Sequence, residues 1–294
     1  MSNILRGVGV ALITPFKEDL SIDFDSLSKL IKYISEEGCD YLVVNGTTGE
    51  SATTTFSEKV ELLAFAKANN PKNLPIVFGL GGNNTSLVIE NINKMDLSGV
   101  SAILSVCPYY NKPSQAGLIA HFTAIADASP VPVILYDVPG RTVTTIAADT
   151  TIALSAHPNI IALKDASTSM DKAINLTKRL PEDFILLSGD DNLVTPQISL
   201  GYQGVISVIA NGFPKHFHEM TWAGLNGDFK KAAALQRRFH VFDDLLYRES
   251  NPVGIKKVVE IRNIARARVR LPLLESSKEL GLLLKEAMKH EGFL

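Results

Sequence analysis

The amino-acid sequence predicts an α/β protein, specifically a (β/α)8 TIM barrel with a C-terminal helical extension. Short apolar runs rich in β-branched residues alternate with longer segments whose apolar residues recur at helical spacing, and this alternation favours a parallel sheet. The runs number eight, which favours a closed barrel over an open doubly wound sheet. The open sheet is the second interpretation. Thr14-Pro15-Phe16, and not a Gly-x-Gly-x-x-Gly sequence, follows the first run, which argues against a dinucleotide-binding sheet.

The expected strands are short and almost free of polar residues, as strands buried on both faces are. They are Gly9–Ile13, Tyr41–Asn45, Pro75–Phe78, Ala102–Val106, Val131–Tyr136, Ile160–Lys164, Phe184–Leu187 and Gly204–Val208. Helices are expected between them, because apolar residues there recur on one helical face. Two such faces are Leu27, Leu30, Ile31 and Ile34, and Val60, Leu63, Ala64 and Ala68.

No strand pattern follows Trp222, and three further helices are expected at Phe229–Leu245, Gly254–Ala267 and Ser276–His290. We divide the chain into a barrel, residues 1–224, and a helical extension, residues 225–294. The extension is too small to be expected to form a core of its own. Its three closely spaced arginines, Arg266, Arg268 and Arg270, are interpreted as a solvated helix face.

Composition excludes several classes of function. Of the 294 residues, 46% are hydrophobic and 20% are charged, with a net charge of -2, so nothing attracts the chain to nucleic acid or to an anionic membrane. No apolar run approaches the roughly 20 residues that span a bilayer, and the first residues do not resemble a secretory signal. We expect a cytoplasmic protein. Cys39 and Cys107 lack Cys or His neighbours at ligand spacing and are expected to be buried thiols.

Lys164 occupies an unusual place in the sequence. It ends the apolar run Asn159-Ile160-Ile161-Ala162-Leu163-Lys164, so a buried strand delivers it to the edge of a core. Partial desolvation disfavours the ammonium form, and a neutral amine can attack a carbonyl carbon to form a Schiff base. The alternative is a lysine that simply begins a solvated loop.

The other strand ends favour the catalytic interpretation, because the active site of a (β/α)8 barrel lies at the C-terminal ends of its strands. Those ends carry an amine, phenols, hydroxyls and a guanidinium. The segments are Gly46-Thr47-Thr48-Gly49-Glu50, Pro108-Tyr109-Tyr110-Asn111, Tyr136-Asp137-Val138-Pro139-Gly140-Arg141, Lys164, Ser188-Gly189-Asp190-Asp191 and Ile206.

Thr47 and Thr48 lie between two glycines, which let the backbone turn tightly and present consecutive N–H groups to an anion. A carboxylate or a phosphate fits such a loop, and an ordinary strand-to-helix turn is the alternative. Glu50 is expected to brace the loop. Tyr136 ends the strand beside the lysine strand, where its phenol either exchanges protons with a forming carbinolamine or packs in the core.

Arg141 follows a Pro-Gly turn and suits bidentate binding of a second carboxylate, unless it pairs with Asp137 or Asp165. Asp190 and Asp191 have no further oxygen ligands beside them in the sequence. We therefore predict no metal site.

Four segments resemble the dihydrodipicolinate synthase/N-acetylneuraminate lyase family of class I aldolases, and the resemblance extends over essentially the whole chain. They are Gly46-Thr47-Thr48-Gly49-Glu50-Ser51-Ala52-Thr53, Pro108-Tyr109-Tyr110-Asn111-Lys112-Pro113, Tyr136-Asp137-Val138-Pro139-Gly140-Arg141-Thr142 and the strand that carries Lys164. Leu187-Ser188-Gly189-Asp190-Asp191 and Gly204-Val205-Ile206-Ser207 also match.

The resemblance implies that Lys164 forms an imine with pyruvate and that no cofactor is needed. Thr47 and Thr48, together with Gly189 and the backbone around Ile206, would hold the carboxylate and keto region of pyruvate. The second substrate implied is aspartate semialdehyde, condensed on the diaminopimelate route to lysine. The assembly implied is a homotetramer built from two dimers.

The resemblance also implies a proton relay. Tyr136 would be the proton donor and acceptor, and Thr48 would link it to Tyr110, which in this family reaches in from the neighbouring subunit. Arg141 would bind the carboxylate of the second substrate. Catalysis would therefore depend on two subunits.

Three other activities remain open from the sequence: a keto-deoxy-sugar acid aldolase, an N-acetylneuraminate lyase and a non-catalytic keto-acid-binding barrel. The sialic acid lyases typically carry Ser-Thr in place of Thr47-Thr48 and lack an arginine at Arg141, so the synthases match best. The sugar acid aldolases share the threonine pair.

Two departures from the family pattern concern regulation and local charge. Synthases inhibited by lysine carry a histidine and a glutamate where this chain has Phe56 and Leu87, although Asn83 and Tyr109 match. Without the glutamate the effector's ammonium lacks a partner, so we predict weak or absent inhibition by lysine. Asp137 replaces the asparagine that is common after the strand tyrosine.

Overall fold

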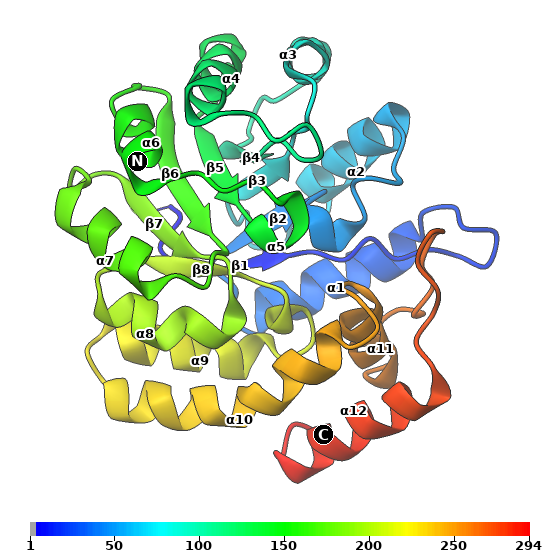
Figure 1. The fold of residues 1–294 in the computed structure, drawn as a ribbon. Helices are drawn as coiled ribbons and strands as arrows, with labels where there is room; N and C mark the ends of the chain where they lie inside the picture. The colour runs from blue at the N-terminus through cyan, green and yellow to red at the C-terminus, as the bar shows by residue number, and fades with distance from the viewer. Residues whose placement is uncertain (1–3) are drawn as a thin grey trace.

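The structure, a computed structural model, describes residues 4–294. Eight parallel strands pair in sequence order and close into a barrel, which confirms the predicted fold (Figure 1). The strands are β1 (Gly7–Ala11), β2 (Tyr41–Val44), β3 (Ile76–Gly79), β4 (Ala102–Val106), β5 (Val133–Asp137), β6 (Ile160–Asp165), β7 (Ile185–Ser188) and β8 (Gly204–Ser207).

Several strand ends differ from the expected bounds by one or two residues. After two of the strands, a side chain provides the hydrogen-bond partner of the backbone. Strand β1 ends at Ala11, and the N–H group of Ile13 donates to the side-chain oxygen of Asn211 at 3.1 Å. Strand β8 ends at Ser207, since the N–H group of Val208 donates to the carboxylate of Asp191 at 2.9 Å.

Helices surround the barrel, as the alternating pattern predicts. They are α1 (Phe24–Glu36), α2 (Phe56–Ala68), α3 (Thr85–Lys94), α4 (Gln115–Ala128), α5 (Pro139–Thr142), α6 (Ala148–Ser155), α7 (Met170–Arg179), α8 (Val194–Ser199) and α9 (Pro214–Leu225), with short 3-10 turns η1 (Thr47–Gly49), η2 (Asp191–Leu193) and η3 (Ile209–Asn211). The expected face of α1 is buried.

The buried face of α2 differs from the expected one. Leu62, Leu63 and Ala66 are buried, whereas Val60 and Ala64 are exposed. Because α2 carries apolar residues on more than one side, their spacing alone does not identify the side that faces the barrel.

The core has two layers, one inside the barrel and one between the strands and the helices. Side chains alternate across each strand, so every second residue faces the barrel interior. In β6, Ala162 belongs to the inner layer and Leu163 to the outer one. The same alternation places Lys164, at the carboxyl end of β6, on the inner side.

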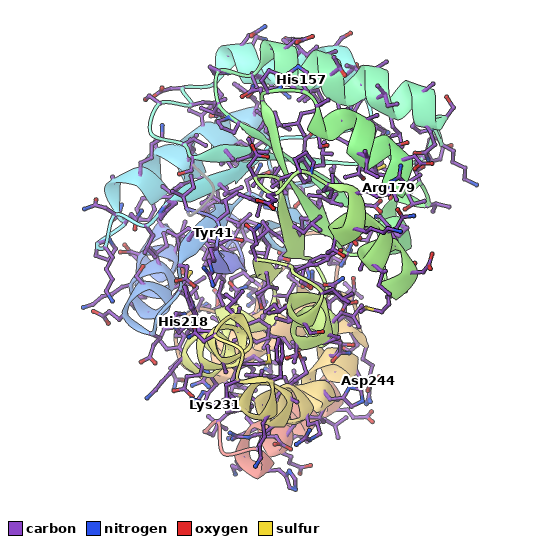
Figure 2. The ribbon with its side chains drawn as sticks, turned by 90° about the vertical axis from the view of Figure 1, so that its left-hand side faces the viewer. Tyr41, His157, Arg179, His218, Lys231 and Asp244 are labelled. Carbon is purple, nitrogen blue, oxygen red and sulfur yellow. The ribbon has the colours of Figure 1, made fainter. Side chains whose placement is uncertain are left out.

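The extension consists of α10 (Phe229–Tyr247), α11 (Val253–Ile261) and α12 (Lys278–His290). Helix α10 packs along α8 and α9 (Figure 1). In the side view of Figure 2, α9 with His218 and α10 with Lys231 lie together at the end of the molecule opposite His157. Phe217 of α9 and Phe239 of α10 join the two helices in a buried edge contact, with ring centroids 5.2 Å apart.

The expected helix Gly254–Ala267 is too long, and α11 ends at Ile261. Asn263 adopts a left-handed conformation (φ 58°), and the N–H group of Ile264 bonds back to the carbonyl of Val259. This pattern ends a helix by satisfying its last carbonyls.

The arginines beyond α11 therefore do not form the predicted helix face. Arg270 instead forms an ion pair with Glu58 of α2. Within residues 4–294, no helix is long and apolar enough to cross a membrane.

Candidate active site

Lys164 and Tyr136 lie side by side at the carboxyl ends of β6 and β5. They are direct partners in the strand register, and the Lys164 ammonium nitrogen lies 4.2 Å from the centre of the Tyr136 ring. Only 5% of Lys164 and 6% of Tyr136 is exposed. The barrel thus presents an amine, largely shielded from water, next to a phenol.

The carboxylates of Asp137 and Asp165 are both engaged by Lys172 of α7, with contacts of 2.5 and 3.2 Å. Asp137 also accepts from the hydroxyl of Thr145 at 2.8 Å. Arg141 contacts neither carboxylate in the described residues, so the structural pairing considered for it from the sequence is absent there.

Thr47 and Thr48 form the short turn η1 directly after β2. Thr48 is 3% exposed, and Glu50 closes the turn in a left-handed conformation (φ 56°). The buried Glu50 carboxylate forms an ion pair with Lys256 of α11 and accepts the N–H group of Arg270 at 3.0 Å. Glu50 therefore braces the loop, as expected.

A cavity of about 450 Å³ opens at this end of the barrel. Tyr136 at its wall also contacts Lys164, so the cavity leads toward the buried amine. Its lining is Asn45, Gly46, Thr47, Ser51, Ala52, Lys59, Gly79, Leu80, Gly81, Gly82, Asn83, Asn84, Leu87, Val88, Asn91, Leu104, Val106, Tyr109, Tyr136, Val138, Arg141 and Thr142.

Arg141 and the two neighbouring tyrosines lie at the outer part of the site. Arg141 is exposed, lines the cavity and donates to the backbone carbonyl of Asn251 at 3.4 Å. Tyr109 also lines the cavity and is 42% exposed. Tyr110 is 88% exposed, has a left-handed backbone (φ 72°) and does not line the cavity of its own chain.

Comparison with known proteins gives a consistent result. The model of the dihydrodipicolinate synthetase family matches residues 4–291. The chain belongs to this family. The 4-hydroxy-tetrahydrodipicolinate synthase of Cytophaga hutchinsonii is 48% identical over 274 residues, which cover 93% of this chain and 92% of the relative.

Solved structures with the same fold include members of the family. The crystal structure of dihydrodipicolinate synthase from Aquifex aeolicus has a TM-score of 0.94 and 38% identity, covering 98% of both chains. A structure described as the first monomeric dihydrodipicolinate synthase variant has a TM-score of 0.96 and 30% identity, covering 100% of this chain and 99% of that one.

Gly189 and Ile206 complete the set of residues that the family resemblance selects. Ile206 is buried among the inner side chains of the barrel. Gly189 follows β7, and a Cβ atom there would lie 2.8 Å from the Cβ of Ala166, so a larger residue does not fit without a shift.

The two aspartates after Gly189 serve the backbone. Asp190 accepts from the N–H group of Asn192. Asp191 accepts from the N–H groups of Val208 and Ile209, and burial raises its pKa to about 7. Within residues 4–294, no group of three or more His, Cys, Asp or Glu residues could hold a metal ion.

The helical extension contributes residues to the candidate site that the sequence analysis does not predict. Asn251 is 6% exposed and donates from its side-chain amide to the Thr48 hydroxyl at 3.2 Å. Lys256 holds Glu50 from the same segment. The Asn-Pro pair and the lysine in an apolar helix were the only available signals, and neither predicts a partner 200 residues away.

Proposed function

We propose that this chain condenses pyruvate with L-aspartate 4-semialdehyde to give 4-hydroxy-tetrahydrodipicolinate, on the diaminopimelate route to lysine. The observation that carries the proposal is the buried Lys164 amine beside Tyr136, a residue that lines a cavity of about 450 Å³. The relative from Cytophaga hutchinsonii, named for this activity, supports it. None of the relatives described above favours a sugar acid aldolase, a sialic acid lyase or a non-catalytic barrel.

The reaction begins when the neutral amine of Lys164 attacks the keto carbon of pyruvate. The carbinolamine loses water to give an imine, and the imine loses a methyl proton to give an enamine. The enamine carbon attacks the aldehyde of the second substrate, whose amine then displaces Lys164 as the ring closes. One water is released, and the lysine is restored, so no cofactor is required by this scheme.

In the proposed roles, Tyr136 moves protons at the carbinolamine and Thr48 passes them to Tyr110. The contact between Tyr136 and Lys164 supports the first role. The exposed Tyr110 fits a residue that serves the cavity of a second copy. Thr47 and Thr48 would bind the pyruvate carboxylate, with Gly189 and Ile206 shaping the keto end.

Arg141 would bind the carboxylate of the second substrate. Its guanidinium lines the cavity and has no carboxylate partner in the described residues, which leaves its planar donors available. This feature favours a substrate with a second carboxylate over a neutral sugar chain.

The proposed role of Tyr110 needs a second copy of the chain, and the family resemblance implies a homotetramer built from two such dimers. One structural neighbour is described as a monomeric variant. The cytoplasmic location and the absence of a metal stay predictions from the sequence.

Reduction with borohydride in the presence of pyruvate tests the proposal. We expect one reduced pyruvyl group on Lys164, and Lys164→Ala should lose both this label and the condensation activity. Lys59→Ala is a matched control, because Lys59 lines the same cavity but bonds only to the carbonyls of Ser51 and Thr54. Labelling of another lysine, or no condensation of aspartate semialdehyde by the pure protein, would refute the proposal.

A further inference from the structure

The side chain of Asn251 is bonded to a residue of the proposed relay from far along the chain. Its amide nitrogen lies 3.2 Å from the hydroxyl oxygen of Thr48, 203 residues away in sequence. Asn251 is 6% exposed, and its backbone carbonyl accepts the hydrogen bond from Arg141. One residue of the extension thus contacts both Thr48 and Arg141.

The Thr48 hydroxyl differs from the hydroxyls around it in its hydrogen bonding. Thr14 and Thr53 each donate their proton to a backbone carbonyl, and the Thr54 hydroxyl lies 3.2 Å from both the Asn45 side-chain oxygen and the Ser51 carbonyl. Thr48 accepts the amide of Asn251, and in the described residues its own proton has no acceptor. A hydroxyl has one donor and two acceptor sites, so this proton is free to point away from Asn251.

The orientation of the Asn251 amide follows from its hydrogen bonds. Its side-chain oxygen is buried without a partner in the described residues, and the nitrogen uses one N–H on Thr48. The reversed amide would give Thr48 an acceptor but leave both N–H groups unpaired. Buried N–H groups without partners are rarer than carbonyl oxygens without partners, which favours the first orientation.

We propose that Asn251 is a positioning residue that sets the direction of proton transfer through Thr48. Its amide always donates, at any pH at which the protein is folded, so the Thr48 hydroxyl is held as an acceptor toward Asn251, with its own proton directed away from that residue. This inference rests on the proposed function, since it assumes that Thr48 takes part in a proton relay.

Two substitutions separate this role from simple packing. Asn251→Asp keeps the shape but presents an ionised carboxylate, which accepts the Thr48 proton and reverses the hydrogen bond. Asn251→Ala removes the partner and lets the hydroxyl rotate. If Asn251 acts by donating a hydrogen bond to Thr48, Asn251→Asp should slow catalysis more than Asn251→Ala does. If Asn251 only fills space, Asn251→Ala should slow catalysis more.

The measurement is the exchange of pyruvate methyl protons for deuterium in D2O, without aldehyde, because this half-reaction needs the imine and the relay but not Arg141. Asn251→Asp should slow exchange by about 30-fold and Asn251→Ala by about 10-fold, below the roughly 100-fold or greater effect of losing a general acid or base. Borohydride trapping at Lys164, run to its end point, should stay within about twofold of the unchanged protein, since a slower relay changes how fast the imine forms and not how much of it forms.

Two further measurements test whether the effect acts through the Thr48 hydroxyl. One is the pH dependence of the exchange rate, and the other is the effect of Asn251→Asp in a protein that also carries Thr48→Val. Exchange by Asn251→Asp, relative to the unchanged protein, should rise as the pH falls, because the introduced carboxyl takes up a proton and donates again. In a Thr48→Val background, Asn251→Asp should cause no further loss. Asn226→Asp is the charge-matched control, because Asn226 is exposed at the end of α9.

The outcomes are distinguishable. If Asn251→Asp exchanges normally while Asn251→Ala is slow, or if the loss persists without the Thr48 hydroxyl, Asn251 only packs and the inference is wrong. If the unchanged protein forms no imine with pyruvate, the proposed function fails first. Circular dichroism of each variant identifies any that does not fold. The variant that remains is then compared with and without Thr48→Val, and a loss that persists without the Thr48 hydroxyl overturns the inference.

Discussion

The ion pair between Lys256 and Glu50 is the point at which a single substitution is expected to cost most stability. Both side chains are essentially buried, at 0% and 2% exposure. The Lys256 ammonium also donates to the carbonyl of Arg268 at 2.7 Å and lies 4.2 Å from the ring centre of Phe16. Lys256→Met keeps most of the side-chain volume but removes the charge and its hydrogen bonds.

The expected loss of unfolding free energy follows from the groups that Lys256→Met leaves without a partner. The Glu50 carboxylate stays buried with the N–H group of Arg270 as its main partner, and the Arg268 carbonyl loses its donor. Removing one partner of a buried pair costs about 3–5 kcal/mol. We expect about 4 kcal/mol for Lys256→Met, and recovery of about half of it when Glu50→Gln is added, because the buried charge is then gone.

Urea unfolding at a fixed protein concentration measures this cost. Lys257→Met is the matched control, because Lys257 is the next residue of α11 and pairs with Glu260 at a half-exposed site. Its loss should be about 0.5 kcal/mol. Equal losses for Lys256→Met and Lys257→Met, or no recovery on adding Glu50→Gln, would refute the reasoning.

Two further predictions concern an effector and pH. Lysine should inhibit condensation weakly or not at all, because Phe56 and Leu87 provide no carboxylate and Lys59 adds an amine to the cavity lining; a saturating inhibition curve below one millimolar would contradict this. Burial lowers the pKa of His121 from 6.5 to about 4. Between these values the unfolded chain binds a proton that the folded protein does not, so stability falls as the pH drops through this window. His121→Gln should remove that part of the loss in urea unfolding at a series of pH values.

The sequence was sufficient for the barrel because the relevant signals are local. Each strand is a continuous apolar run, and the eight strands pair in the order in which they occur in the sequence. The predicted end of a strand is wrong where a side chain far away in the sequence bonds to its backbone. Asn211 binds the N–H group of Ile13 at the end of β1, and no periodicity in residues 9–13 contains that information.

The candidate site was predictable to the extent that it lies at strand ends. Lys164 and Tyr136 each end a predicted strand, and parallel pairing then makes them neighbours. The proposed role of Tyr110 depends on a second copy of the chain, and no pattern within one sequence specifies how two copies meet. Helical spacing predicts a helix face at Arg270, but it does not reveal the left-handed residue Asn263, which follows the end of α11.

The extension is better understood as part of the candidate active site than as an appendage to the barrel. Three of its residues act on the single turn that carries Thr48: Asn251 bonds the hydroxyl of Thr48, while Lys256 and Arg270 hold Glu50 two residues later. The two cations also lie over the ring of Phe16, at 4.2 and 4.4 Å. A turn with two glycines is intrinsically flexible, and the proposed relay requires the Thr48 hydroxyl within hydrogen-bond range. The extension therefore supplies the rigidity that the glycine-rich turn lacks.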